Sequence, residues 1–402
     1  MLRVLFVDDD SRALAELKRS TEQMAGEWEM VFVESGAKGL LAMLNAPFDV
    51  VVTDLVMPGM DGGELLTHVM AKYSQTVRIL LSESGEEGSE MQVVGSAHQY
   101  LCKPCEPATL RDTVVRAFVL RNIIADDRLK KIVSQIQTLP TVPTLYLEML
   151  KELRNDDPSV VRLGHLISQD LGMCTKMLQL VNSAFFGLSQ NISNPGEAIL
   201  YLGVNTVKNV VLSLQVFSGF ESKVKNYPFE RLWSHCWATG VLAKGLAEAE
   251  DLGAQAADHA FIAGLLHDVG KLILASSLPD RYHAIVEAHL QQGRPLWEVE
   301  EEMIGSSHAE VGGYLLGLWG LPTPVVEAVA LHHRPMASSG HEFSLVTALH
   351  LASVLEHEKS RNIGDQAPVS QLDLNYLTEI GLHERIDFWR ETAGVAPLKL
   401  AV

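Results

Sequence analysis

The chain has 402 residues, 47% of them hydrophobic, which predicts two or three domains with sizeable cores. Its formal net charge is −18. Residues 1–125 hold 11 Lys and Arg against 18 Asp and Glu, and the remaining residues are also net acidic. Neither half therefore has the basic excess that direct nucleic-acid binding requires. No uncharged apolar run reaches the ~18 residues of a membrane span, and acidic residues from position 8 argue against a signal peptide. We therefore expect a cytoplasmic protein.

Over the first 122 residues, short apolar runs alternate with amphipathic stretches. Strands are expected near residues 3–7, 28–33, 49–53, 77–81 and 98–102, with helices between them. This alternation predicts an α/β domain with a doubly wound parallel sheet of five strands and right-handed crossovers. Four of the runs end in polar side chains, which are Asp8 with Asp9, Asp54, Ser82 and Lys103.

The carboxyl ends of parallel strands lie side by side, at the edge of the sheet where ligands bind. Carboxylates crowded at this edge favour Mg²⁺, which commonly takes one or two carboxylates together with water and phosphate oxygens. Asp54 could then attack a phosphoryl donor and carry an acyl phosphate. A single aspartate at such a turn is more often structural, but its polar neighbours favour the chemical interpretation.

These residues make positions 1–122 similar to the receiver domain of two-component response regulators, which has a flavodoxin-like fold. The resemblance implies that a sensor histidine kinase phosphorylates Asp54. It also implies a Mg²⁺ site whose ligands are Asp8, Asp9, Asp54 and the carbonyl of Val56.

The same resemblance implies a switch around the phosphoryl group. Lys103 contacts the phosphoryl oxygens and precedes Pro104, whose peptide bond is cis in this family. Ser82 moves toward the phosphate, and Tyr100 changes rotamer with it. Glu83 replaces the small residue that usually follows the hydroxyl, which changes the expected speed of dephosphorylation or the shape of the entrance.

A connecting helix is expected over residues 123–139. Apolar residues recur at helical spacing from Leu110 to Leu139, with a polar break at residues 126–128, and Pro140 ends the pattern. The segment is a rod between two domains, an ordinary last helix with a linker, or a short coiled coil in a homodimer, because the apolar stripe is too interrupted to define a heptad seam.

Four cysteines are too few and too scattered for a disulfide framework. Cys102 and Cys105 form a C-x-x-C pair that could suggest redox chemistry. The two residues between them are already explained by the receiver resemblance, which favours the non-redox interpretation.

From residue 140 onward the pattern is helical, which predicts an all-α domain over residues 140–340 and helices over residues 341–402 that complete or cap it. Of the 15 histidines, 11 lie between residues 235 and 357. Imidazoles and a carboxylate from separate helices can bind Zn²⁺, Mn²⁺ or Fe and polarise a phosphate. A lone histidine is more often structural, so the indication comes from the whole set, His235, His267, Asp268, His308, His332 and His333.

This region resembles the HD superfamily of metal-dependent phosphohydrolases and, within it, the HD-related output domain, or HDOD, subgroup. Residues 139–143 and 180–184 match that subgroup rather than the catalytic cyclic-dinucleotide phosphodiesterases. Carried over by position, the hydrolase pattern makes the six residues of the histidine set candidate metal ligands. Lys271 matches the lysine that contacts phosphate in the family.

Two departures from the hydrolase pattern weigh against catalysis. Arg334 and Pro335 stand where the hydrolases have a Gly-Tyr-Pro segment, and Ser353 stands in place of the aspartate that closes their metal site. Loss of that carboxylate removes negative charge that balances two cations, although a mononuclear site could survive.

Three functions are therefore compared for the helical domain. The sequence favours a phosphorylation-controlled output that binds an unidentified downstream protein. The second is a phosphohydrolase acting on a cyclic dinucleotide or a related substrate. The third is an HD scaffold that binds a nucleotide or one metal without turnover.

Overall fold

The computed structural model describes residues 1–83, 96–103, 105–121, 126–134, 158–182, 192–214, 229–338, 342–361 and 371–395, with a few single residues between them. Several sequence predictions lie outside this part of the chain, namely the fourth helix of the sheet domain, Pro104, and segments 139–143 and 183–184. The side chains of Glu83, Tyr100 and Cys102 are also outside it.

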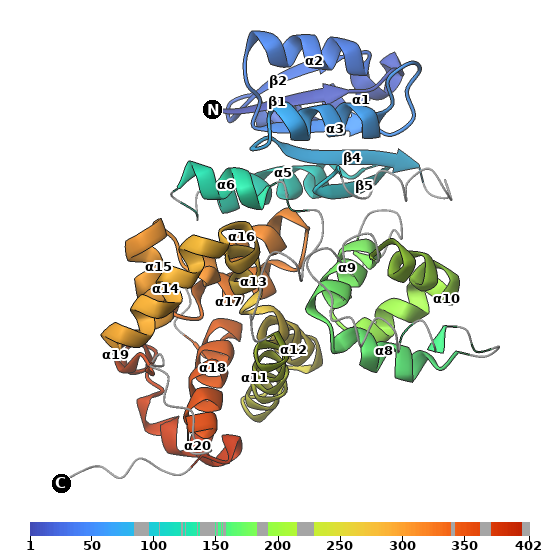
Figure 1. The fold of residues 1–402 in the computed structure, drawn as a ribbon. Helices are drawn as coiled ribbons and strands as arrows, with labels where there is room; N and C mark the ends of the chain where they lie inside the picture. Colours follow the sequence, from blue (N-terminus) through green and yellow to red (C-terminus); the bar gives the residue numbers. More distant parts are fainter. Residues whose placement is uncertain are drawn as a thin grey trace.

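A five-stranded parallel sheet forms the N-terminal domain, with the strand order β2-β1-β3-β4-β5 (Figure 1). Its strands are β1 (Leu2–Val7), β2 (Trp28–Val33), β3 (Val50–Asp54), β4 (Val77–Glu83) and β5 (Gln99–Lys103). The helices described with it are α1 (Ser11–Thr21), the short η1 (Glu22–Met24), α2 (Gly36–Asn45), α3 (Gly62–Lys72) and α5 (Pro107–Arg121). The doubly wound sheet predicted from the sequence is confirmed.

Side chains of β1 alternate between two hydrophobic cores, because successive residues of a strand point to opposite faces of the sheet. Leu5 and Val7 belong to the core that includes residues of α2 and α3. Val4 and Phe6 belong to a second core that continues from the sheet into the helical domain. The sheet is therefore buried on both faces, as near-continuous apolar strands require.

The connection after the sheet domain is not one continuous helix. Asp126 has extended backbone angles, and its carboxylate accepts hydrogen bonds from the backbone N–H groups of Arg128 and Leu129, so it caps a new helix, α6 (Asp127–Val133). Of the alternatives left open by the sequence, a rod continuous with α5 is excluded, because Asp126 starts a new helix. An aspartate satisfies free N–H groups at a helix start better than it fits a helix interior.

The rest of the described chain is helical, which confirms the predicted all-α domain. Its α-helices are α8 (Val160–Ser168), α9 (Leu171–Val181), α10 (Pro195–Leu214), α11 (Phe229–Ala249), α12 (Ala254–Leu266), α13 (Val269–Ser277), α14 (Pro279–Gln292), α15 (Leu296–Ile304), α16 (His308–Leu318), α17 (Thr323–Leu331), α18 (Leu345–Arg361), α19 (Leu374–Glu379) and α20 (Ile386–Ala393). Two short turns, η4 (Pro335–Ala337) and η5 (His383–Arg385), accompany them. The stretch Ala254–Ser277 is long and apolar enough to cross a membrane by composition, but 78% of the apolar 18-residue segment within it is buried, as in core helices.

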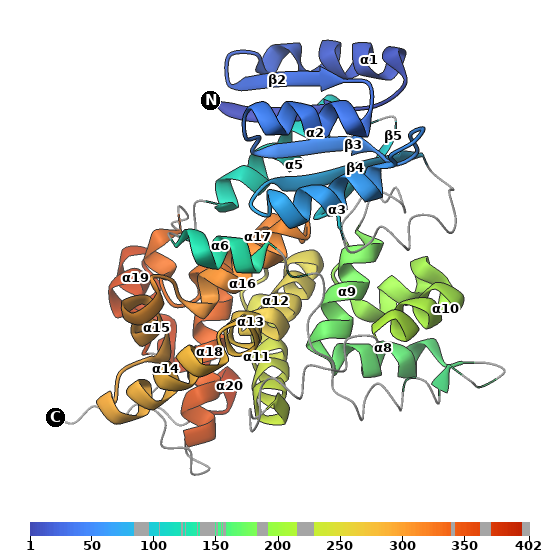
Figure 2. The same cartoon turned by 45° about the horizontal axis from the view of Figure 1, so that its top comes forward.

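The two domains meet through β5, α5 and α6. Figures 1 and 2 show α5 and α6 between the sheet and the helical domain. The side-chain amide of Gln99 on β5 donates to the carbonyl of Gly317 on α16 at 3.1 Å, and Arg78 on β4 donates to the carbonyl of Ser134 after α6 at 2.8 Å. The sheet is thus connected directly to α16, which begins at His308.

Candidate functional sites

The first site lies at the carboxyl ends of strands β1, β3 and β5, at one edge of the parallel sheet. Asp8 follows β1, Asp54 ends β3 and Lys103 ends β5, so the parallel sheet brings them to one edge. Lys103 Nζ lies 2.6 Å from Asp8 Oδ2 and forms an ion pair with Asp54. Oxygen atoms of Asp8, Asp9 and Asp54 all lie within 4.8 Å of one another. The predicted convergence of strand ends is therefore present.

The Asp54 carboxylate is held in a defined orientation. Its Oδ2 accepts a hydrogen bond from the N–H of Val56 at 3.0 Å. Burial raises the pKa of Asp54, which the ammonium of Lys103 only partly offsets. Burial would lower the pKa of Lys103, but Asp54 and Asp8 outweigh it and raise that pKa. Ser82 is buried one residue beyond Leu81, the register partner of Asp54 on β4.

The donor set of this edge fits magnesium. Three carboxylates on one side of a shallow site provide the hard oxygen ligands that Mg²⁺ prefers, and such sites leave room for water and phosphate oxygens. Asp9 is exposed to solvent, whereas Asp8 is buried, so the site opens outward.

The second site is formed in the helical domain by the predicted histidine set. One group consists of His235 on α11 with His267 and Asp268 at the α12–α13 junction, and the other consists of His308 at the start of α16 with His332 and His333 after α17. Within each group, one ligand atom from every residue lies within 4.8 Å of the others. All six predicted residues are thus brought together from five helices or their ends.

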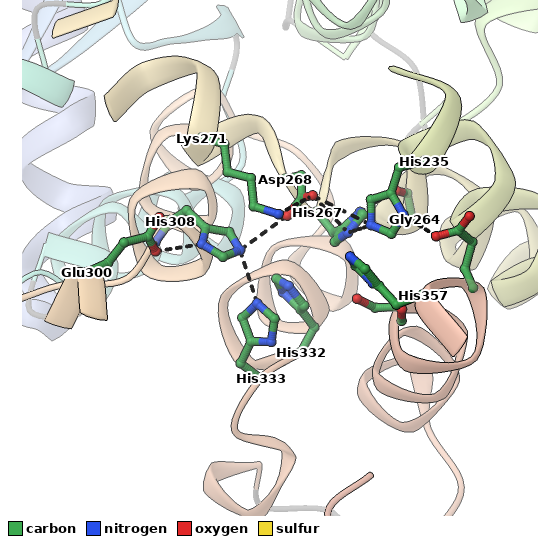
Figure 3. A network of polar contacts seen from close by, with 12 residues as sticks. His235, Gly264, His267, Asp268, Lys271, Glu300, His308, His332, His333 and His357 are labelled. Atoms are coloured by element: carbon green, nitrogen blue, oxygen red, sulfur yellow. Dashed lines mark hydrogen bonds and ion pairs between the residues drawn. The ribbon is translucent and has the colours of Figure 1, made fainter. Parts of the chain in front are cut away.

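Asp268 connects the two groups (Figure 3). Its Oδ1 lies 3.2 Å from His308 Nε2, while its Oδ2 lies 3.4 Å from His267 Nε2 and 3.6 Å from His235 Nε2. Lys271, one turn further along, places its Nζ 2.6 Å from the same Oδ2. The carboxylate therefore has one oxygen directed to each histidine group.

Backbone hydrogen bonds fix which ring nitrogens face the interior of this cluster. His267 Nδ1 donates to the carbonyl of Gly264 at 2.7 Å, and His332 Nδ1 donates to the carbonyl of Val329 at 2.8 Å. These bonds place the proton on Nδ1 and leave a lone pair on Nε2. His332 Nε2 is buried and has no hydrogen-bond partner among the residues that the structure describes. A buried acceptor of this kind is available to a metal ion or a water molecule.

The electrostatics favour neutral imidazoles at His267, His332 and His333, beside an ionised carboxylate. Burial lowers the pKa of His267 to about 3, and burial lowers the pKa values of His332 and His333 well below the ordinary range. Burial would also lower the pKa of His308, but the carboxylate of Glu300 outweighs it and raises that pKa. Burial would raise the pKa of Asp268, yet the surrounding imidazoles and ammonium hold it well below its usual value. Deprotonated imidazoles are the form that binds metal ions.

Three further residues of the site were missed by the sequence reasoning. Glu300 accepts a hydrogen bond from His308 Nδ1 at 2.6 Å, and Glu356 is hydrogen-bonded to His235 Nδ1. His357 packs its ring 4.1 Å from that of His235, measured between centroids.

Ser353 stands where the hydrolases have an aspartate, but α18 brings another carboxylate, that of Glu356, to the site. Ser353 does occupy a buried position on α18, and its carbonyl accepts a hydrogen bond from His357 Nδ1 at 2.7 Å. Glu356 and His357 follow Ser353 by three and four residues, which places them on the same face of the helix. That spacing was the signal available in the sequence.

Fold and sites together define a class of two-domain protein, in which an α/β domain with carboxylates gathered at its sheet edge precedes a helical domain with a cluster of histidines around an aspartate. Residues 4–115 match the family model of the response regulator receiver domain, and residues 139–335 match that of the HDOD domain. The chain therefore carries a response regulator receiver domain followed by an HDOD domain.

Individual relatives are similar to parts of the chain. A Treponema pallidum protein described only as uncharacterized is 32% identical over 226 residues, which are 55% of this chain and 44% of that protein. The response regulator protein FleR of Pseudomonas aeruginosa is 35% identical over 115 residues, 28% of this chain and 24% of FleR. These alignments span less than half the length of the relatives. The solved MmoQ response regulator of Methylococcus capsulatus is 23% identical, with a TM-score of 0.48 over 63% of this chain and 98% of MmoQ.

Proposed function

We propose that a sensor histidine kinase phosphorylates Asp54 and that this phosphorylation controls the output of the HDOD domain. The observation that carries the proposal is the position of the Lys103 ammonium, which pairs with both Asp8 and Asp54 at the end of the sheet. An ammonium held there is ready to pair with a phosphoryl group on the neighbouring carboxylate.

Each residue of this site has a separate role in phosphoryl transfer. Asp8 and Asp9, with Asp54 and the Val56 carbonyl, would hold Mg²⁺, which when bound shields charge on the phosphoryl oxygens. The Asp54 carboxylate supplies the oxygen that attacks the phosphorus of the kinase's phosphohistidine, and the P–N bond breaks as the kinase histidine leaves. The product carries about −1.5 to −2 charges at neutral pH, and Lys103 pairs with them.

The contact between the domains offers a route for the signal. Lys103 ends β5, and the same short strand begins with Gln99, which bonds to the carbonyl of Gly317. By the receiver resemblance, Ser82 and Tyr100 are the proposed switch residues. Their rearrangement would change the populated position of β5 against α16.

The test compares two aspartate substitutions in the full chain. Asp54→Asn should abolish uptake of labelled phosphate from a phosphorylated kinase in the presence of Mg²⁺. Asp112→Asn, an exposed carboxylate on α5, is the matched control and should leave uptake unchanged. Undiminished labelling of the Asp54 variant would refute the proposal.

For the output itself, the absence of a Gly-Tyr-Pro segment supports binding of a downstream protein. A second candidate is a metal-dependent phosphohydrolase with cyclic dinucleotides among its substrates. It is favoured by the bridging position of Asp268 and by His332 Nε2, which has no hydrogen-bond partner in the described part of the chain. The six predicted ligands fit Zn²⁺, Mn²⁺ or Fe, since imidazole and carboxylate are suitable donors for them. Such a metal, when bound, polarises a phosphate and activates water.

In that second function, the protein's own residues hold and orient the phosphate. Lys271, whose ammonium lies against Asp268, is within the same cluster and can pair with a phosphate oxygen. Elemental analysis of the purified protein, combined with a cyclic-dinucleotide hydrolysis assay on the same sample, separates the candidates. Bound metal with turnover supports the hydrolase, bound metal or nucleotide without turnover supports a non-catalytic scaffold, and neither supports partner binding.

A further inference from the structure

The two halves of the histidine cluster share an arrangement that the sequence motifs do not contain. In each half, a glutamate bonds to the Nδ1 of the histidine that faces Asp268. Glu300 Oε2 accepts from His308 Nδ1 at 2.6 Å, and Glu356 Oε2 accepts from His235 Nδ1. The Glu300 carboxylate thus lies behind the His308 ring, which directs Nε2 toward Asp268 (Figure 3). Glu356 bonds His235 in the same way, with His235 Nε2 3.6 Å from Asp268 Oδ2.

The spacing of the inward nitrogens fits metal coordination. His235 Nε2 lies 3.2 Å from His267 Nε2, and both rings have their Nδ1 engaged with acceptors. Two nitrogen lone pairs this close repel each other unless a proton or a cation lies between them. Two nitrogens bound tetrahedrally to one ion at about 2.0 Å lie about 3.3 Å apart. His308 Nε2 and His333 Nε2, at 3.0 Å, have a similar separation in the other half.

Charge provides an independent argument. Asp268 is the carboxylate that faces the inward nitrogens, and the ammonium of Lys271 already offsets its charge at 2.6 Å. Divalent cations among neutral imidazoles in a buried site are costly unless anions lie close by. Glu300 is fully buried, and the Glu356 side chain is only 12% exposed, so both charges act through a poorly screened medium.

On the basis of the metal centre proposed above, we infer that Glu300 and Glu356 are its positioning residues. Each holds one metal-binding histidine through Nδ1 and fixes its tautomer and direction. Glu356 also restores, one helical turn later on α18, the negative charge that Ser353 does not provide. Carboxylate partners of this kind typically change metal affinity by about 10- to 100-fold.

Glu300 is anchored more firmly than Glu356. Its Oε2 also accepts the backbone N–H of His308 at 2.7 Å, and its Oε1 accepts the hydroxyl of Tyr282 at 3.1 Å. Substitution of Glu300 would therefore also disturb the backbone of the α15–α16 junction. Glu356 lies on α18 and bonds the side chain of His235 on another helix, α11. Glu356 is the better position for the decisive test.

The experiment measures Zn²⁺ binding to the full chain by chelator competition, with stoichiometry by elemental analysis. Glu356→Gln should weaken the affinity by about 10- to 100-fold while the number of ions at saturation stays that of the unsubstituted protein. Its metal-free melting temperature should be unchanged, and only the rise in melting temperature on adding Zn²⁺ should shrink. A purely structural role would instead lower the metal-free value. Glu302→Gln, an exposed glutamate on α15, is the matched control and should bind normally.

Failure of the inference and failure of the metal centre give different results. If Glu356→Gln and Glu356→Ala bind Zn²⁺ like the unsubstituted protein while His235→Ala loses an ion, the centre stands and the positioning role is refuted. If the unsubstituted protein binds no Zn²⁺ more tightly than His308→Ala does, the metal centre fails and the inference fails with it.

Discussion

Gly270 sets the distance between α13 and α16, and its replacement tests the geometry of the histidine cluster. A Cβ at this position would lie 1.9 Å from the carbonyl oxygen of His308 and 3.0 Å from the backbone nitrogen of Gly312. Because carbon and oxygen seldom approach closer than about 3.3 Å, the two helices must separate by roughly 1.4 Å at this point. Overpacking costs about 1–3 kcal/mol, and a clash with backbone belongs at the upper end. We expect Gly270→Ala to lose about 3 kcal/mol.

The same displacement reaches the candidate metal centre. His308 begins α16, and its Nε2 lies 3.2 Å from Asp268 Oδ1, just before α13, so a shift of this size breaks the contact. Urea denaturation followed by circular dichroism measures the stability, and Zn²⁺ affinity measured in parallel should fall. Gly245→Ala on α11 is the matched control, since its Cβ would meet nothing within 4 Å and the change should stabilise the helix by up to about 1 kcal/mol. Equal stabilities for the two variants would refute the close approach of α13 and α16.

Three further outcomes are expected. Gln99→Ala removes the 3.1 Å hydrogen bond to Gly317 and should lower the free energy of unfolding by about 1 kcal/mol. Amide hydrogen exchange at the end of α16 should become faster, and unchanged exchange there would contradict the contact. Burial, together with the charge of Arg78, holds the pKa of His98 well below 6.5 in the folded protein. As the pH falls, only the unfolded chain therefore binds a proton at this histidine. The free energy of unfolding should decline below about pH 6.5, by up to about 2 kcal/mol at pH 5. His98→Gln should flatten that decline, and an equally steep decline would count against it. Chelation with EDTA should lower the melting temperature of a metal-loaded sample, and no shift would argue against a structural contribution from the metal.

The receiver site could be read from the sequence because its geometry is nearly local. Once apolar runs alternate with helices, the sheet must be parallel, and the carboxyl ends of its strands must share one edge. Asp8, Asp54 and Lys103 each end or directly follow such a run, so their convergence follows from topology alone. The six-residue histidine set was also found, but from motif resemblance rather than from spacing.

The sequence by itself therefore determined the two domain types, the polar edge of the sheet and the candidate metal ligands. Only the tertiary structure decided that Asp126 interrupts the connection, that Gln99 contacts Gly317, and that Glu300 and Glu356 support the histidines. The physical reason is that a strand end is fixed by its own segment, whereas the neighbour of a helix face depends on how distant helices pack. The spacing of Glu356 from Ser353 indicates its helix face, but a glutamate 121 residues from its histidine leaves no local pattern that identifies the two as partners.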